Sequence, residues 1–288
     1  MSPISWADLV AQPLGAIPFL IDPYIPEGGI VLLYGKTRIG KSPLTWEIAR
    51  CLGSGEPFLG RPTRSSHVLY LELDTPRRLV QARVERLPTA PNVWWEFIPA
   101  INVFEASSQG HLRSLETQCH PDTVIVNTLR AIHYGDEKDA AIPLRVYKTF
   151  QAIFPKAAIL FVHHDKKSSG NPEDSSDPDE AFSGHMAWFN HCQTGLHLVR
   201  HGTLNAGLLR LVHSKSQVSA EAPDLILKLS DDGSQIVNFS PTRLNEILTL
   251  YQELGGQKTE RVRIIARQVG LSERQVWTYL SRLPECAD

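Results

Sequence analysis

The chain has 288 residues, of which 42% are hydrophobic and 21% charged, and its formal net charge is −2 at pH 7. This composition is that of an ordinary globular protein able to bury a sizeable core, and it excludes attraction to nucleic acid or membrane through overall charge. The four cysteines are far apart and include no CxxC pair, which favours reduced thiols in a cytoplasmic protein. No stretch is apolar enough to cross a bilayer, and no secretory signal pattern opens the chain.

Residues 1–28 carry several prolines and aromatic residues, and we expect a lead-in packed on the core. Beyond it, apolar runs alternate with helical patterns, which predicts a mostly parallel sheet with helical crossovers. Strands are expected at 30–34, 67–73, 93–98, 123–126, 158–162, 195–200, 208–213 and 225–229, and helices at 43–52, 76–87, 110–118 and 142–154. The later strands have no helices between them and predict an antiparallel extension.

The polar segment 165–184, DKKSSGNPEDSSDPDEAFSG, is typical of a mobile loop. After Ser240 the sequence becomes helical without strands. We therefore expect a core domain at 29–240 and a small all-α module at 241–288.

The stretch VLLYGKTRIGKSPLTWEIA fits the pattern G-x-x-x-x-G-K-[ST] between an apolar strand and a helix. Backbone amides in such a loop cradle a β-phosphate at the positive end of the helix. Lys41 is expected to reach the β- and γ-phosphates of ATP, and the Ser42 hydroxyl to bind Mg²⁺. Pro43 suits the first helical turn. The alternative, a glycine-rich turn with an incidental lysine, is disfavoured by this context. The expected nucleotide-binding residues are Gly35, Lys36, Thr37, Arg38, Ile39, Gly40, Lys41, Ser42 and Pro43.

A pair of acids follows the next apolar run, VLYLELD. Glu72 and Asp74 are two residues apart, so on a strand both side chains would leave the same face. A carboxylate beside the nucleotide loop can orient and deprotonate an attacking water. The alternative is a solvated acid at a strand end.

Residues 25–87, from IPEGGIVLLYGKTRIGKS through PFLGRP to VLYLELDTPRRLVQARVERL, resemble the RecA-like ATPases of the plasmid RepA replicative helicase type. The resemblance continues more weakly through the later strands, and it covers about residues 12 to 230. It implies an α/β RecA-like P-loop core, ATP with Mg²⁺ between subunits of a hexameric ring or filament, and action on single-stranded DNA. Most of the chain is covered, and the spacing of these three segments is the specific part.

Two positions depart from the family pattern. The resemblance places the catalytic carboxylate at Asp74, where the family has the longer glutamate, and Glu72 could compensate. The run TVIVN ends in Asn127, where the family has an aspartate that holds Mg²⁺ through water. We expect nucleotide binding with slow hydrolysis. The alternatives are a working site supported by Thr128 and Glu72, or an engineered change that traps ATP.

The resemblance also suggests that His163 or His164 senses the γ-phosphate. Adjacent residues on a strand point oppositely, so we expect one histidine at the nucleotide and the other packed, in preference to a metal site. Lys215 matches a basic residue that reaches the neighbouring subunit's ATP, with Arg210 as a second candidate. A surface lysine beside a strand is an equally good reading.

Two regions are candidates for DNA contact. Lys166 and Lys167 lie where related rings line their channel, although acidic residues outnumber them in that loop. The C-terminal run IARQVGLSERQVWTYLSRL has helix-turn-helix spacing at Ala266, Gly270 and Val276, with a capping box from Ser272 to Gln275. The residues expected to face duplex DNA are Arg274, Gln275, Thr278 and Arg282. The alternative is a helical module for protein contacts.

The sequence therefore predicts an oligomeric, DNA-acting ATPase, a replicative helicase or helicase-like motor of a mobile element. The rivals are a nucleotide-gated recruitment factor that hardly hydrolyses ATP, and a transcription regulator with an ATP-sensing domain.

Overall fold

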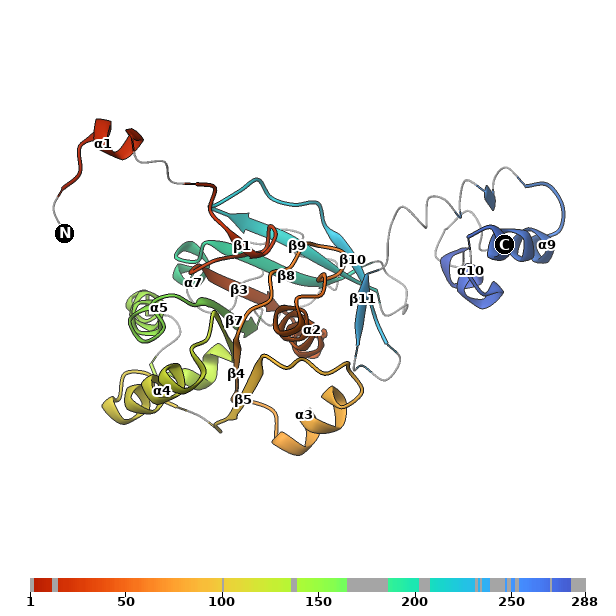
Figure 1. The fold of residues 1–288 in the computed structure, drawn as a ribbon. Coiled ribbons are helices and arrows are strands. Elements are labelled where there is room, and N and C mark those ends of the chain that lie inside the picture. The colour runs from red at the N-terminus through yellow and green to blue at the C-terminus, as the bar shows by residue number, and fades with distance from the viewer. Residues whose placement is uncertain are drawn as a thin grey trace.

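The computed structural model describes residues 3–11, 15–99, 101–135, 139–164, 186–201, 208–230, 233, 235–238, 247, 250–251, 254–269 and 271–280. Its core is a nine-stranded sheet in the order β11-β10-β9-β8-β3-β7-β6-β4-β5 (Figure 1). The strands are β3 (Ile30–Gly35), β4 (Val68–Glu72), β5 (Val93–Phe97), β6 (Thr123–Asn127), β7 (Ala158–His164), β8 (Thr194–Arg200), β9 (Leu208–Ser216), β10 (Leu225–Leu229) and β11 (Ile236–Asn238).

The strands from β5 to β8 in this order pair in parallel, whereas β9, β10 and β11 extend the sheet antiparallel. Parallel neighbours need a crossover connection, and helices supply it. These are α2 (Lys41–Ser54), α3 (Arg77–Val84), α4 (Ala106–Cys119) and α5 (Ala141–Ile153). The predicted α/β fold, its mostly parallel sheet and its antiparallel extension are confirmed.

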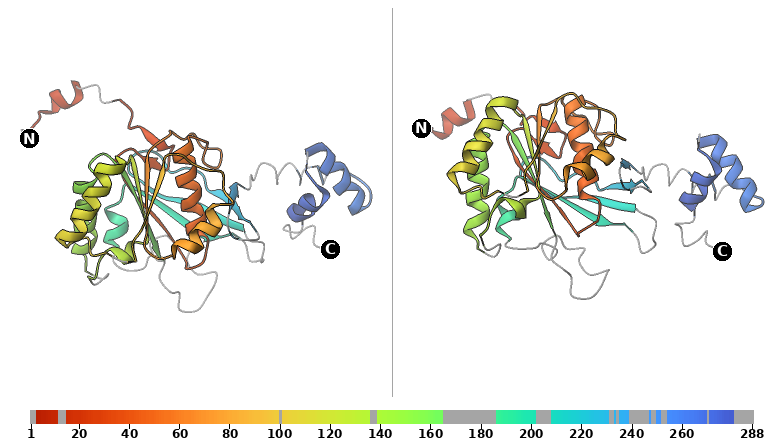
Figure 2. Two further views of the ribbon diagram at one scale, coloured as in Figure 1. Left: turned by 60° about the horizontal axis from the view of Figure 1, so that its bottom comes forward. Right: turned by 90° about the horizontal axis from the view of Figure 1, so that it is seen from below.

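Apolar side chains cover both faces of the central strands. In β3, Val31 and Leu33 join the cluster around α2, while Leu32 and Tyr34 join the cluster beneath α4, α5 and α7 (Ala187–Asn190). Figure 2 shows these helices on opposite sides of the twisted sheet. Burial on both faces explains why the central strands read as continuous apolar runs.

The lead-in that was expected to pack on the core divides into two parts. Strands β1 (Phe19–Ile21) and β2 (Ile25–Pro26) form a small antiparallel sheet that is largely buried. Helix α1 (Trp6–Ala11) buries no residue, and every described residue from 3 to 18 is exposed.

The C-terminal stretch contains α9 (Lys258–Val269) and α10 (Glu273–Leu280), which enclose a small apolar core of their own. Ala266 and Val276 are buried in it, and Gly270 lies outside the described residues. The capping box is confirmed, because the Gln275 amide donates to Ser272 Oγ at 3.3 Å and Ser272 N donates to Gln275 Oε1 at 2.9 Å. The boundary near 241 also lies outside the described residues.

Within the described part of the chain, no helix has an apolar span of the length that a bilayer crossing needs.

Strand β11 was not predicted, because its three residues are too few to show a period.

Candidate functional site

The glycine–lysine loop connects β3 to α2 at the carboxyl edge of the parallel strands. Gly35 closes β3, and a Cβ there would lie 2.5 Å from the Leu198 carbonyl oxygen of β8. Gly40 has φ +112°, a conformation that residues with a side chain rarely adopt. The two glycines are therefore required for different reasons. Gly35 allows the close approach of the neighbouring strand, and Gly40 allows the left-handed turn into the helix.

Lys41 is the first residue of α2, and its side chain folds back across the loop. Its ammonium group donates to the Gly35 carbonyl at 2.6 Å and to the Lys36 carbonyl at 2.9 Å, and it is almost fully buried. Buried lysines are rare unless their charge is compensated. A cation held inside a ring of backbone groups at a helix N-terminus suits an anionic ligand such as a phosphate chain.

The two histidines that end β7 occupy different environments. His164 places Nδ1 3.2 Å from Lys41 Nζ and 3.4 Å from Thr37 Oγ1, so its ring lies against the loop. His163 is buried, with its ring 6.2 Å from that of Trp188. This is the arrangement expected for adjacent strand residues, one at the loop and one in the core.

Glu72 ends β4 directly beside Asn127, which ends β6. The Asn127 amide donates to Glu72 Oε2 at 2.9 Å, and the backbone amides of Asp74 and Thr75 donate to Oε1 at 3.1 and 2.9 Å. Burial raises the pKa of Glu72, and these three donors oppose that effect. Glu72 is 2% exposed, so its carboxylate is a fixed part of the strand edge.

Asp74 differs from Glu72 in its surroundings. Strand β4 ends at Glu72, so the expectation that the two acids share one strand face does not apply. Asp74 lies in the following turn, which Glu72 braces, and its side chain is exposed. The arrangement separates a buried, hydrogen-bonded carboxylate from a solvent-facing one.

Sequence reasoning missed Tyr70 and Thr45. Tyr70 precedes Glu72 by two residues on the strand, and its hydroxyl lies 2.7 Å from Thr45 Oγ1 of α2. Burial raises the pKa of Tyr70 well above its usual value, with the Glu72 carboxylate adding to the effect. The contact ties the helix that begins at Lys41 to the strand that carries Glu72. The alternation Tyr70–Glu72 on one face of an apolar run was the available signal.

Lys215 and Arg210 are both held by contacts within the chain. Lys215 Nζ donates to the Phe189 and Asn190 carbonyls at 2.7 and 2.8 Å, at the C-terminal end of α7, and burial lowers its pKa. Arg210 forms an ion pair with Asp224 at 3.4 Å. Neither contact involves the glycine–lysine loop.

Of the proposed DNA-contacting residues, Arg274 and Gln275 of α10 are exposed, and Thr278 is partly exposed. The Thr278 hydroxyl donates to the Arg274 carbonyl at 2.8 Å, and Gln275 Oε1 is engaged in the cap. Arg282, Lys166 and Lys167 lie outside the described residues.

A mostly parallel sheet with a glycine–lysine loop between its central strand and a helix is the architecture of P-loop ATPases, the class to which RecA-like proteins belong. A family described as an AAA domain matches residues 2–170, more than half of the sequence, and the chain belongs to this family. No curated protein matches the sequence of the chain.

Solved structures share the fold at low sequence identity. A KaiC-like protein from Pyrococcus horikoshii matches with a TM-score of 0.52 and 11% identity, over 77% of this chain and 94% of that one. The ATPase domain of G40P matches with 0.57 and 10%, over 81% and 96%. A DnaB-like replicative helicase, described with its primase interactions, matches with 0.58 and 12%, over 81% of this chain and 65% of that one.

Proposed function

We propose that this protein is an ATPase that binds ATP with Mg²⁺ at residues 35–43. The observation that carries the proposal is the buried Lys41 ammonium, folded across a loop that only glycine permits at Gly35 and Gly40. Lys41 turns from the loop carbonyls to the β- and γ-phosphates, and the helix N-terminus adds its partial positive charge. His164, whose ring lies against Lys41, would then be placed to contact the γ-phosphate.

Ser42 would hold Mg²⁺ directly and Asn127 through water, since hydroxyl and amide oxygens are ligands that this ion accepts. The ion, when bound, neutralises charge on the phosphate oxygens. The strand-edge placement of Asn127 beside Glu72 supports this assignment. Asn127 lacks the charge of an aspartate, so we expect weak metal affinity and slow turnover.

The two acids divide the remaining work. Asp74 is the catalytic residue, because its carboxylate faces solvent and can accept a proton from an attacking water. Glu72 is a positioning residue, since it fixes the Asp74 amide and the turn that presents Asp74.

Calorimetry and phosphate release test these roles together. We expect Lys41→Ala to weaken ATP binding by about 100-fold, as a phosphate-binding lysine should. Asp74→Asn should reduce phosphate release at least about 100-fold with unchanged ATP affinity. Unaltered heats of ATP binding in Lys41→Ala would refute the assignment of the nucleotide site. Full turnover in Asp74→Asn would refute only the assignment of Asp74 as the base.

A second candidate is a nucleotide-gated recruitment factor or transcription regulator with little turnover. The hydrogen bond from the Asn127 amide to the Glu72 carboxylate favours this second candidate. The bond engages both side chains with each other, and an amide stands where a second carboxylate would bind a metal ion more strongly. Phosphate release with and without single-stranded DNA separates the two: stimulation by DNA supports the motor, and its absence supports the recruitment factor.

The proposal also includes action on DNA and assembly into a ring or filament. In that assembly Lys215 or Arg210 contacts the ATP bound to the neighbouring subunit. For Lys215 this requires release from the α7 carbonyls. The capped α10, with Arg274 and Gln275 exposed, supports a helix-turn-helix that contacts duplex DNA. Arg274→Ala should weaken binding to a duplex in fluorescence anisotropy. Equal affinity of both proteins would assign the module to protein contacts.

A further inference from the structure

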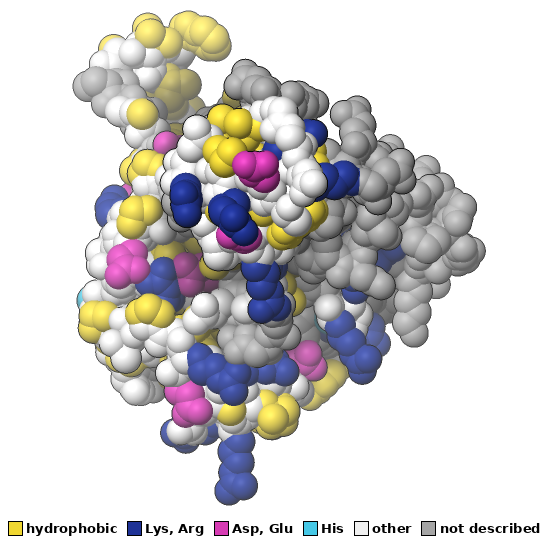
Figure 3. Space-filling view, turned by 90° about the vertical axis from the view of Figure 1, so that its right-hand side faces the viewer, with side chains coloured by type: hydrophobic (Ala, Val, Ile, Leu, Met, Phe, Trp, Pro, Cys, Tyr) yellow, Lys and Arg dark blue, Asp and Glu magenta, His cyan; other side chains and the backbone are white. Residues whose placement is uncertain are grey.

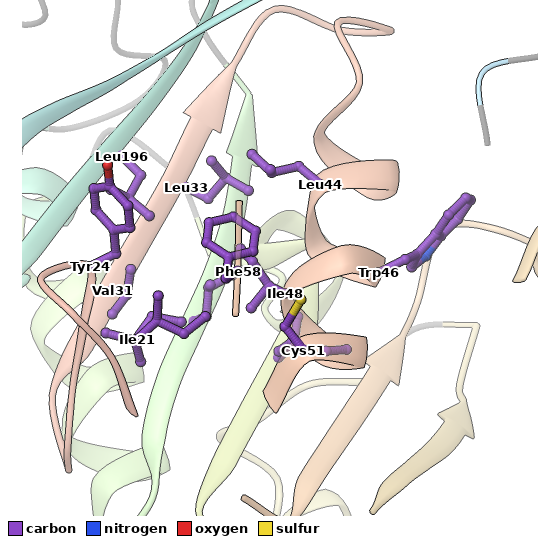
Figure 4. Packing of buried hydrophobic residues seen from close by; sticks show 14 of the residues in the cluster. Ile21, Tyr24, Val31, Leu33, Leu44, Trp46, Ile48, Cys51, Phe58 and Leu196 are labelled. Carbon is purple, nitrogen blue, oxygen red and sulfur yellow. The ribbon is translucent and has the colours of Figure 1, made fainter. Parts of the chain in front are cut away.

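The α2–α3 cavity is a hollow of about 430 Å³ between α2, α3 and the start of β5. Its lining is mostly apolar and includes the partly exposed side chain of Trp95. Trp46 closes its floor, because this side chain lines the cavity and is 1% exposed. Figure 4 shows Trp46 leaving α2 on the side away from Tyr24 and Phe58. A mostly apolar cavity of this size with a few polar groups is the usual form of a small-molecule site.

The aromatic wall of the cavity is held in place by its neighbours. The ring centre of Trp95 lies 4.3 Å from that of Tyr70 and 6.0 Å from that of Phe97, with 26° and 13° between the ring planes. The guanidinium group of Arg83 lies 5.8 Å from the centre of the Trp46 ring. Because these rings are fixed by contacts within the chain, the cavity offers a preformed surface to a flat aromatic ligand.

The polar lining of the cavity suits the edge of a nucleobase. Gln81 and Glu85, four residues apart at the end of α3, both line the cavity and are exposed. A side-chain amide donates and accepts hydrogen bonds, and a carboxylate accepts them. Together they match the mixture of donors and acceptors that a base edge presents. Arg50 also lines the cavity, but its guanidinium group is paired with two glutamates of the chain.

Arginines supply positive charge for a phosphate beside the cavity. Arg77 and Arg78 are exposed, and they lie four and three residues before Gln81, on the same side of α3. Among the ion pairs within the described part of the chain, none involves either arginine. The segment 77–86 carries two more exposed arginines and a single acid, in a chain whose net charge is −2. Figure 3 shows basic side chains at the lower end of its face, the level at which α3 lies in Figure 1.

We propose that the α2–α3 cavity is a nucleotide-binding site separate from the glycine–lysine loop. The base packs on the wall that includes Trp95, and its edge meets Gln81 and Glu85. The phosphate meets Arg77 and Arg78. A free mononucleotide and a nucleotide of a single DNA strand present the same ring and the same phosphate, so both are sources of this ligand.

The dimensions of the two helices support this assignment. Helix α3 rises about 10 Å between Arg77 and Val84, which leaves room for a sugar between the phosphate and the base. On α2, Ala49 lines the cavity and lies eight residues beyond Lys41, about 12 Å along the helix axis. A ligand in the cavity therefore occupies a place different from that of a phosphate chain at Lys41.

Fluorine NMR on the full-length chain measures occupancy of the cavity. The tryptophans are replaced by 5-fluorotryptophan, and Trp95→Phe assigns the Trp95 resonance. The probes are AMP, adenosine, inorganic phosphate and a short single strand of deoxyadenosine nucleotides, each titrated without Mg²⁺. We expect a saturable shift of the Trp95 resonance, with affinity at least about 10-fold lower for adenosine and for phosphate than for the nucleotide.

The outcomes separate the two sources of the ligand. Saturation by AMP identifies the free nucleotide, and a response to the strand alone identifies single-stranded DNA. No shift with either overturns the proposal. It is also overturned if adenosine or inorganic phosphate alone binds as tightly as the nucleotide.

Substitutions on α3 test the contacts one by one. Arg77→Ala/Arg78→Ala should weaken nucleotide binding about 10-fold, because charge-assisted contacts to the phosphate are lost. Gln81→Leu keeps the approximate size of the side chain and should weaken binding about 2- to 10-fold. Arg113→Ala, at an exposed arginine of α4 on the opposite side of the sheet, is the matched control and should leave the affinity unchanged (Figure 2). Native affinity in the double arginine variant, with the fold retained in circular dichroism melts, overturns the phosphate assignment.

Lys41→Ala distinguishes this inference from the proposed function. The Trp95 response should persist in Lys41→Ala, because the cavity does not use the glycine–lysine loop. A response that disappears in this variant assigns the nucleotide to the loop and overturns the separate site. A chain that binds ATP in calorimetry but shows no Trp95 shift with AMP or the strand loses only this inference, whereas a Trp95 shift without heat from ATP refutes only the proposed function.

Discussion

Replacement of Asn127 by aspartate tests the arrangement at the ends of β4 and β6. In the native chain the Asn127 amide donates to Glu72 Oε2 at 2.9 Å, and Glu72 is 2% exposed. Asn127→Asp removes this donor and places a second carboxylate against the first. The substitution introduces the aspartate that the resemblance to RepA-type ATPases implies at this position. It therefore tests whether an amide, and not a carboxylate, is needed beside Glu72.

The expected loss of stability in Asn127→Asp follows from the distance between the two carboxylates. Two unit charges about 3 Å apart repel by about 6 kcal/mol at an effective dielectric constant near 20, which corresponds to about four pKa units. Such a pair shares one proton instead of keeping both charges. We therefore expect the free energy of unfolding to fall by about 2 to 4 kcal/mol at pH 8, which includes the lost hydrogen bond. At pH 5 the shared proton remains, and the loss should be small.

Urea denaturation of Asn127→Asp and the native protein at pH 5 and pH 8, without divalent ions, measures the difference. Glu72→Gln/Asn127→Asp is the control, because the glutamine amide can then donate to the new aspartate. It should recover most of the stability. Added Mg²⁺ should stabilise Asn127→Asp more than the native protein. An Asn127→Asp chain as stable as the native one at pH 8 would refute the coupling between these two side chains.

Three further outcomes follow from other contacts. Gly35→Ala should lower the free energy of unfolding by about 1 to 3 kcal/mol in urea titrations, since its Cβ would meet the Leu198 carbonyl at 2.5 Å. Gly110→Ala, in α4 with no atom near its Cβ, should instead be neutral or stabilising. The raised pKa of Glu72 means that the native state holds its proton more tightly than the unfolded state. Stability should therefore fall as pH rises from the ordinary carboxyl range through that raised pKa, and chemical denaturation of Glu72→Gln should lack the slope. Ser272→Ala should remove a helix cap worth about 0.5 to 2 kcal/mol, and hydrogen exchange at the Gln275 amide should then quicken about 2- to 30-fold; unchanged exchange would contradict this.

The sequence by itself determined the local features of this protein. Continuous apolar runs marked β3 and β7, because strands buried on both faces need apolar residues throughout. The spacing of Gly35, Gly40 and Lys41 identified the phosphate loop, because few other residues allow that backbone path. Capping at Ser272 was also readable, since it depends on residues three apart.

The tertiary structure decided everything that depends on which strands are neighbours. Glu72 and Asn127 are 55 residues apart in sequence, and only the order β6–β4 places one beside the other. The same holds for His164 against Lys41 and for Lys215 on the α7 carbonyls. Sequence periodicity tells which face a side chain takes, but it carries no information about the element that packs against that face. For this reason the division between a bracing Glu72 and an exposed Asp74 became visible only in the folded chain.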